Sequence, residues 1–185
     1  MKIVKQKDIK VQVVEKGQRI NIEKGLYFDV LWANSKNVIN ENNINNNSLV
    51  FKIVYKKFSM LFTGDIEETA EKAILKEYKH TLKSTILKIA HHGSKTSSIS
   101  EFVNTVKPKI ALIGVGEKNT FGHPNQQTIE KLENINCRVY RTDLMGEIII
   151  KINNKEKINI KSKSKIKWYK FKIYLPKGKN WAIII

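Results

Sequence analysis

The chain has 185 residues, of which 41% are hydrophobic and 28% charged, a composition typical of a folded globular domain and not of a disordered segment. It contains no apolar run near the roughly 20 residues that a membrane-spanning helix requires, and its first residues lack the apolar core of a signal peptide. We therefore expect the chain as given to be cytoplasmic. Its single cysteine, Cys137, excludes an internal disulfide and any zinc site built from several cysteines.

The net charge of +17 is concentrated toward the C-terminus, where residues 151–185 hold eleven lysines and one acid, Glu156. Such an excess of positive charge favours polyanionic partners, either nucleic acid or anionic lipid. The same excess also arises in a chain that is simply rich in lysine, asparagine and isoleucine. Both interpretations of the charge stay open on the sequence alone.

The first part of the chain is expected to be mostly β-structure. Alternating apolar and polar residues, and runs of aromatic and β-branched residues, predict strands, with the last two joined as a hairpin through Lys56 and Lys57. Residues 33–47 contain eight asparagines and no hydrophobic period, which predicts a long surface loop. The expected strands cover residues 10–14, 19–22, 26–32, 48–55 and 58–63.

The second part alternates short strands with amphipathic helices. Apolar residues at helical spacing predict the helices, with Ser97 or Ser98 capping the second and Pro124 in the first turn of the third. The expected strands cover 85–90, 110–115, 137–141 and 146–152, and the expected helices cover 67–78, 98–106 and 125–133. This order indicates an α/β layered domain.

The residues from 161 onward differ from the rest of the chain. Lysines alternate there with small or apolar residues, and aromatic residues such as Trp168, Tyr169 and Trp181 follow. Lysines and aromatics together could hold phosphates and stack on bases. They could equally form an edge strand with a poorly packed extension, so the sequence leaves the role of this tail open.

Two apolar runs end in side chains that bind metals. Residues 58–63 lead directly to Gly64 and Asp65, and residues 85–90 lead to His91 and His92. A carboxylate and an imidazole at the rim of a sheet suit zinc or manganese. Asp65 could instead cap the following helix, and the histidines could be structural. Because neighbouring side chains point in different directions, we expect only one of the two histidines to face a given ion.

A hydroxyl-rich segment follows the histidine pair. Ser94 and Thr96, with Lys95 between them, could contact a phosphate, or the hydroxyls could form the N-terminal cap of a helix. Asn119 and His123 lie in the loop after the strand expected over 110–115. If that strand is parallel to its neighbour, His123 ends on the same side as the histidine pair, as a substrate contact or general acid, or as a structural residue at a helix start.

Several motifs then occur in a fixed order, and together they resemble the metallo-β-lactamase-like domain of the ComEC/Rec2 DNA-uptake family. The resemblance covers about residues 10–153. The motifs are Asn45-Asn-Asn-Ser-Leu-Val50, Leu61-Phe-Thr-Gly-Asp-Ile-Glu67, Leu87-Lys-Ile-Ala-His-His-Gly-Ser-Lys-Thr-Ser97, Asn119-Thr-Phe-Gly-His-Pro124, Tyr140-Arg-Thr-Asp143 and Gly146.

The resemblance implies an αββα sandwich with a dinuclear metal site, in a nuclease attached to a membrane channel in the full-length family members. It places Asp65 and His92 as metal ligands, His91 and His123 as catalytic residues, and Ser94, Lys95, Thr96 and Asn119 as substrate contacts. The implied ion is zinc or manganese, weakly bound if at all, and the implied partner is DNA. The assignments of His91 and His92 could be exchanged.

The sequence departs from the family in one important respect. The main metal motif of the superfamily, His-x-His-x-Asp-His, is absent, because no histidine precedes His80. The resemblance therefore predicts the C-terminal half of the sandwich over residues 1–153, with a basic tail over 154–185. Such a half is expected to be inactive alone and to self-associate, or to pair with a separately encoded N-terminal half or a membrane channel. A non-catalytic basic module that binds nucleic acid, and a gene fragment without function, are the alternatives.

Overall fold

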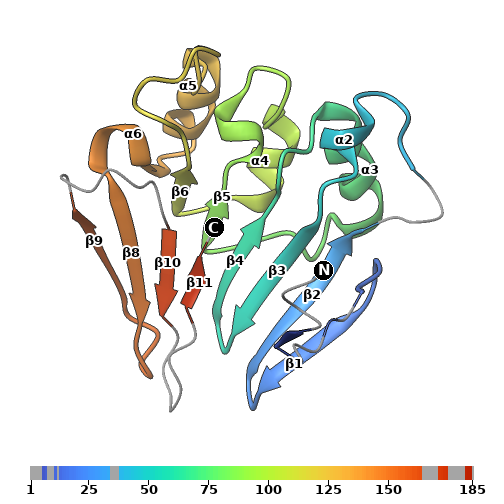
Figure 1. Ribbon diagram of the computed structural model, residues 1–185, viewed down its shortest axis with the longest axis vertical. Coiled ribbons are helices and arrows are strands. Elements are labelled where there is room, and N and C mark those ends of the chain that lie inside the picture. Colours follow the sequence, from blue (N-terminus) through green and yellow to red (C-terminus); the bar gives the residue numbers. More distant parts are fainter. Residues whose placement is uncertain are drawn as a thin grey trace.

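The computed structural model describes residues 6–7, 11, 13–33, 38–163, 171–174 and 182–184. These residues form two β-sheets, one of seven strands in the order β1-β2-β3-β4-β5-β6-β7 and one of four in the order β11-β10-β8-β9 (Figure 1). The strands are β1 (Arg19–Glu23), β2 (Leu26–Trp32), β3 (Val50–Tyr55), β4 (Phe58–Phe62), β5 (Ile86–Lys88), β6 (Ile110–Ile113), β7 (Arg138–Arg141), β8 (Glu147–Ile152), β9 (Ile158–Lys163), β10 (Phe171–Tyr174) and β11 (Ala182–Ile184).

The larger sheet is antiparallel from β1 to β4 and parallel from β4 to β7. The parallel part needs a crossover between each pair of strands, and a helix supplies each one. The helices are α2 (Asn43–Asn46), α3 (Glu68–Tyr78), α4 (Ser100–Val106), α5 (Gln126–Asn134) and α6 (Thr142–Met145), with a 3₁₀ turn η1 (Ala90–Gly93) after β5. The strand and helix alternation expected from the sequence is confirmed.

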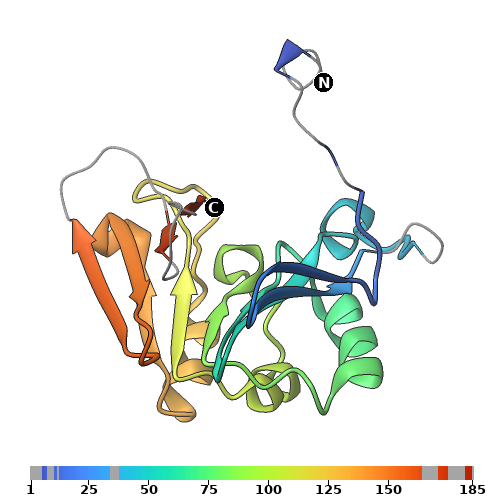
Figure 2. The ribbon, with the colours of Figure 1, turned by 90° about the horizontal axis from the view of Figure 1, so that it is seen from below.

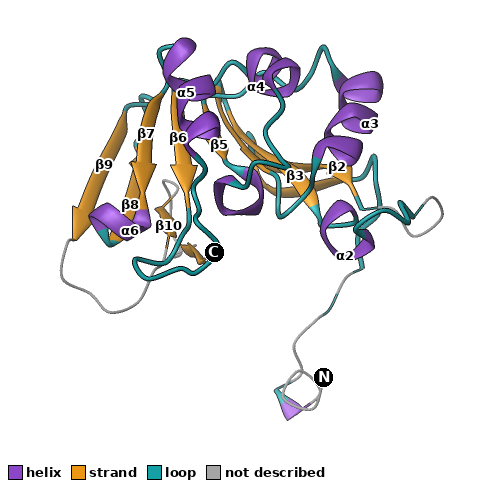
Figure 3. Ribbon diagram, turned by 90° about the horizontal axis from the view of Figure 1, so that it is seen from above, coloured by secondary structure: helices purple, strands orange, loops and turns teal. Residues whose placement is uncertain are grey.

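Both faces of the larger sheet are covered, so the molecule has two apolar cores. On one face Leu61 and Leu87 pack with Ile74 of α3 and Phe102 of α4. On the other, strand residues such as Met60 pack against isoleucines of β8 in the smaller sheet. Neighbouring residues of a strand point to opposite faces, which is why Met60 and Leu61 enter different cores. Figures 2 and 3 show α3, α4 and α5 along one side of the large sheet.

This layering confirms the α/β class expected from the sequence. Helices cover the outer face of the larger sheet, and a second sheet packs on its inner face. The three pairs from β4 to β7 are parallel, which brings the carboxyl ends of β4, β5 and β6 to one edge. The candidate site lies at that edge.

Three local expectations were wrong. Val11, Val13 and Val14 lie outside any strand, and the asparagine-rich segment expected as a loop contains helix α2, with Asn46 fully buried. The cap of α4 is not a serine hydroxyl, because the side chain of Glu71 in α3 takes that place. Its carboxylate accepts hydrogen bonds from the backbone N–H groups of Ser98 (2.7 Å) and Ile99 (2.8 Å).

The chain continues as β-structure beyond residue 153. Strand β9 pairs antiparallel with β8, and β10 pairs parallel with β8 on the opposite side. The domain boundary expected at residue 153 stays a prediction, and Trp168, Tyr169 and Trp181 of the basic tail lie outside the described residues. In the described part of the chain, no helix combines the length and apolarity needed to cross a bilayer.

Candidate metal site

Asp65 stands just beyond β4, where a tight turn brings two chain segments together. Gly64 has φ +55°, and a Cβ atom there would lie 2.6 Å from the Cβ of Ser48, so the turn requires glycine. The carbonyl of Gly64 accepts a hydrogen bond from the N–H of His91 (3.1 Å), and the N–H of Asp65 donates to the hydroxyl of Ser48 (3.2 Å). The ends of β4 and β5 are therefore tied together through their backbones.

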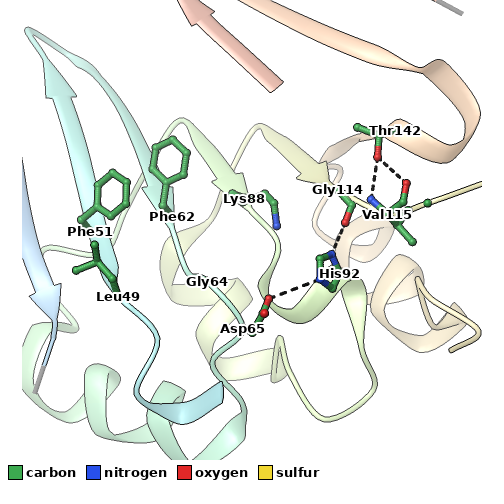
Figure 4. A pocket seen from close by; sticks show the side chains of 11 residues that line it. Leu49, Phe51, Phe62, Gly64, Asp65, Lys88, His92, Gly114, Val115 and Thr142 are labelled. Atoms are coloured by element: carbon green, nitrogen blue, oxygen red, sulfur yellow. Dashed lines mark hydrogen bonds and ion pairs between the residues drawn. The ribbon is translucent and has the colours of Figure 1, made fainter. Parts of the chain in front are cut away.

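His92 faces Asp65 across this edge. Its Nδ1 atom lies 2.5 Å from the carbonyl oxygen of Gly114, and a carbonyl only accepts, so Nδ1 carries the proton. The other ring nitrogen, Nε2, then has a free lone pair and lies 3.9 Å from Oδ1 of Asp65 (Figure 4). Both side chains are about half exposed, at 50% and 44%. The pair can therefore receive a ligand from solvent.

His91 points to a different place. Its Nδ1 atom lies 3.3 Å from Oε1 of Glu67, while its ring centre lies 6.4 Å from that of His92 and 5.7 Å from that of His123. This Nδ1 atom is buried and has no hydrogen-bond partner among the described residues. Both adjacent histidines have positive φ angles, 46° and 54°, and this turn separates their side chains.

Glu67 is a site residue that the sequence reasoning missed. Its carboxylate accepts hydrogen bonds from the side chains of Asn42 (2.5 Å) and Thr96 (2.9 Å), and it lies beside His91. Burial acts to raise the pKa of Glu67, but hydrogen bonds from Asn42, Thr96 and Asn45 and the charge of His91 lower it more, so the net pKa is below its ordinary value. Glu67 thus joins the asparagine-rich segment to the histidine turn as a charged carboxylate.

Lys88 is a second residue that the sequence reasoning missed. It ends strand β5, is only 7% exposed, and donates a hydrogen bond from Nζ to the carbonyl of Ile89 (2.8 Å). Burial lowers the pKa of Lys88 to about 8, against the opposing effect of Asp65. A lysine within the apolar run of residues 86–90 was the available signal, because a charge in a buried strand usually has a specific role.

A cavity of about 430 Å³ connects these groups with an aromatic wall. Its polar end holds Asp65, Lys88 and His92, and its apolar end includes Phe51 and Phe62, whose rings stack at 4.6 Å with an interplanar angle of 9°. The remaining lining residues are Leu49, Gly64, Gly114, Val115, Gly116 and Thr142. The cavity is of the size that accepts a small molecule or one unit of a polymer.

His123 lies near His91 but outside this cavity lining. Its ring stacks on Phe121 at 5.9 Å, and its pKa is lowered by burial and by the charges of His91 and His92. Asn119 holds the backbone of His123 in place, since its side chain donates to the carbonyl of His123 (2.8 Å) and accepts from its N–H (2.9 Å). Asn119 therefore stabilises the loop that carries His123.

The hydroxyl segment is spread over different environments. Ser94 is buried and its hydroxyl lies 3.0 Å from that of Thr96, which in turn donates to Glu67. Lys95 is exposed on the surface. The structure therefore brings Asp65 together with His92 and Lys88, and His91 together with His123 and Glu67. The substrate-contact roles of Ser94, Lys95, Thr96 and Asn119 stay predictions.

The donors present fit a metal ion in type and spacing but not in number. Ligand bonds of about 2.0–2.1 Å at tetrahedral angles put two zinc ligands roughly 3.4 Å apart, so Asp65 and His92 need only a small closure from 3.9 Å. A zinc site takes three or four protein ligands. Within the described residues no group of three or more histidine, cysteine or acidic side chains is placed to hold an ion.

Comparison with known proteins finds sequence similarity to competence proteins. It is 31% identical over 155 residues to ComE operon protein 3 of Bacillus subtilis, an alignment that covers 84% of this chain and 19% of that protein. Competence protein ComA of Neisseria gonorrhoeae is 31% identical over 124 residues (67% of this chain, 18% of that protein). Recombination protein 2 of Haemophilus influenzae is 32% identical over 126 residues (68% and 15%). The chain is thus related to the ComEC/Rec2 proteins.

The chain spans a fifth or less of the length of these relatives. No protein-family model matches it. Among solved structures, a protein of Parabacteroides distasonis assigned as a metal-dependent hydrolase overlays on 77% of this chain and 62% of its own, with a TM-score of 0.47 and 12% identity.

Proposed function

We propose that this chain is part of the metal-dependent hydrolase domain of a DNA-uptake protein, and that the chemistry of the domain is hydrolysis of a phosphodiester bond in DNA. The relation to competence proteins supports the biological setting. One structural observation supports the proposed reaction. Oδ1 of Asp65 and Nε2 of His92 converge at the end of two parallel strands, beside a cavity. Carboxylate and imidazole donors at such an edge suit zinc or manganese.

In this proposal Asp65 and His92 hold the ion. A divalent ion in such a site polarises a phosphoryl oxygen and activates water when it is bound. The hydrogen bond to Gly114 keeps the proton of the neutral ring on Nδ1 of His92, which leaves the lone pair of Nε2 for the ion. Burial and the charges of His91 and His92 lower the pKa of His123, which favours its neutral form, and the neutral ring has a lone pair that can accept a proton as a general base.

We further propose that the isolated chain binds metal weakly and does not turn over. Asp65 and His92 are two donors, and the sequence has no histidine before His80 that could form the His-x-His-x-Asp-His motif. The missing ligands would come from residues outside these 185, for example in a separately encoded half of the domain or in a channel protein. Self-association of the chain is a second way of completing the site.

A nuclease assay on the purified chain tests this proposal. Single- and double-stranded DNA are incubated with the chain in zinc or in manganese, beside Asp65→Ala and His92→Ala variants. We expect no metal-dependent cleavage above the level of the two variants. Robust cleavage by the wild-type chain that both substitutions abolish would show that the site is complete, and would contradict the proposed need for outside ligands.

A second function, binding of nucleic acid without catalysis, is favoured by a basic cavity elsewhere on the molecule. A cavity of about 600 Å³ beside the β1–β4 part of the sheet is lined by several cations, among them Lys52, Lys56, Lys57 and Lys83. This function predicts an affinity for DNA that falls steeply with salt and is unchanged in Asp65→Ala and His92→Ala. An affinity that depends on Asp65 and His92 would exclude it.

A further inference from the structure

The cavity beside Asp65 has two ends of different chemistry, and the proposed metal site uses only part of one. Figure 4 shows Leu49, Phe51 and Phe62 on one side and Lys88, Asp65 and His92 on the other. Neither the lysine nor the aromatic pair is needed to hold an ion. A ligand that explains both must carry a negative group and a flat apolar group.

Lys88 supplies the fixed cation of this cavity. A buried ammonium group is costly unless it is paired, and the described residues give it a single hydrogen bond, to the carbonyl of Ile89. The ammonium group has three N–H donors, so two remain for a ligand. In Figure 4 its nitrogen is directed toward the side where Asp65 and His92 lie. The positive charge of Lys88 offsets the negative charge of Asp65, so an anion can enter this end of the cavity.

Phe51, which is partly exposed, supplies the flat apolar surface, and Phe62, which is only 3% exposed, packs behind it. They stack face to face across the β3–β4 pair, and Phe28 of β2 packs edge-on against Phe51 at 5.7 Å, which fixes the orientation of the outer ring. Stacking of a base on a fixed aromatic ring is the usual way in which proteins hold single-stranded nucleic acid without reading its sequence. The half-exposed side chains of Asp65 and His92 leave the polar end open to solvent.

We propose that this cavity binds one nucleotide unit of DNA, with the phosphate on the ammonium group of Lys88 and the base against Phe51 and Phe62, and that this binding needs no metal ion. The inference rests on the proposed function, since it names how the same site would hold its substrate. It assigns Lys88 a direct role as a phosphate ligand. It also explains why a charged residue ends an otherwise apolar strand.

The test is a titration of the full chain with thymidine 5′-monophosphate in the presence of EDTA, followed by NMR. Inorganic phosphate and thymidine are titrated separately. We expect Lys88→Met to weaken binding of the monophosphate about tenfold or more, since a charge-assisted hydrogen bond is lost, and Lys88→Arg to retain it. Phe51→Leu should weaken binding of the monophosphate and of thymidine but not of phosphate.

Lys131→Met is the control, because Lys131 is a partly buried lysine that, like Lys88, donates to a backbone carbonyl, that of Ser98 (3.1 Å), but lies outside the cavity. It should bind the monophosphate as the wild-type chain does. Circular dichroism of each variant shows whether the fold is intact, and Lys88→Met is expected to fold because an apolar side chain replaces a buried charge.

Three outcomes would overturn the proposal. They are no saturable binding of the monophosphate, equal affinity for the monophosphate and for phosphate alone, and binding that Lys88→Met leaves unchanged. A zinc titration of the same samples distinguishes a failure of the nucleotide site from a failure of the proposed metal site. If Asp65→Ala removes zinc binding while no nucleotide binds, only the nucleotide site is wrong. If nucleotide binds as expected and zinc does not, only the metal site is wrong.

Discussion

Oδ1 of Asp65 and Nε2 of His92 lie 3.9 Å apart although 26 residues separate them in the sequence, because β4 and β5 are adjacent parallel strands that end at the same edge. Each partner is held independently. The N–H of Asp65 donates to Ser48, and Nδ1 of His92 donates to Gly114. Separate hydrogen bonds therefore position the two residues, and not attraction between their side chains, so the hydrogen bond from His92 to Gly114 should persist in Asp65→Ala.

Gly93→Ala should destabilise the fold and displace the loop that carries His123. Gly93 has φ +84°, and an added Cβ would lie 2.6 Å from the Cβ of Pro124. Strain at a positive φ together with this clash should cost about 2–3 kcal/mol, measured by urea unfolding. Gly116→Ala is the control, since nothing lies within 4 Å of its added Cβ, and it should change stability little. Equal stability of the two variants would refute the close packing of Gly93 on Pro124.

Glu71→Gln should remove a pH dependence of stability between about pH 4.5 and 7. Burial raises the pKa of Glu71 to about 7 from its ordinary value of 4.5, although backbone N–H groups and Lys131 oppose the rise. The folded chain then holds a proton that the unfolded chain has released. The stabilisation present below pH 4.5 is lost as the pH rises through 7, by up to about 3 kcal/mol.

The measurement is urea unfolding of the wild-type chain and Glu71→Gln across this pH range. The difference between the two isolates Glu71 from other carboxylates, which change in both proteins. If the free energy of unfolding changes with pH in the same way for both proteins, Glu71 does not have a raised pKa and is not buried as the cap of α4.

Lys88→Met should make the chain more stable at neutral pH. Burial lowers the pKa of Lys88 to about 8 from 10.5, so the unfolded chain holds more protons than the folded chain between these values. Wild-type stability should therefore rise with pH from about 8 to 10.5, by up to about 3 kcal/mol, because the cost of the buried charge disappears. The variant lacks this rise. A Lys88→Met chain that is less stable than wild type at pH 7 would contradict the burial of an incompletely paired ammonium group.

Glu67→Ala should loosen the asparagine-rich segment from the histidine turn. The substitution leaves the side chains of Asn42 and Thr96 without their shared acceptor, which should cost about 1–3 kcal/mol at neutral pH. The pKa of Glu67 is lowered in the fold, so this stabilisation is present above pH 4.5 and is lost as the pH falls through the folded pKa. Thermal unfolding at pH 7 and at about pH 3 measures both effects. A stability difference between wild type and Glu67→Ala that is larger at about pH 3 than at pH 7 would contradict the role of the charged Glu67 carboxylate.

The sequence allowed much of the fold to be predicted because the hydrophobic pattern is local. Strands β2 and β4, and helix α3, lie within a residue or two of their expected positions, since apolar spacing defines them directly. The approach of Asp65 to His92 was also predictable, because carboxyl ends of parallel strands meet. The divergence of His91 and His92 was expected as well, although a 3₁₀ turn produces it and not a strand end.

The residues that were missed are charged groups whose partners are distant in sequence. Glu71 caps a helix 27 residues away, and Glu67 joins Asn42 to Thr96. In the sequence Lys88 is only a charged residue within an apolar strand, and its role becomes visible only when the cavity around it is known. No local pattern marks such residues, because their environment exists only after the sheets and helices have packed.

Calorimetric titration of the purified chain with zinc is the measurement that bears most directly on the proposed half-complete site. We expect one weak site per chain, with a dissociation constant weaker than about 10 µM because only two donors converge, and we expect Asp65→Ala and His92→Ala each to abolish it. Binding of two ions per chain, or tight binding that survives either substitution, would contradict it.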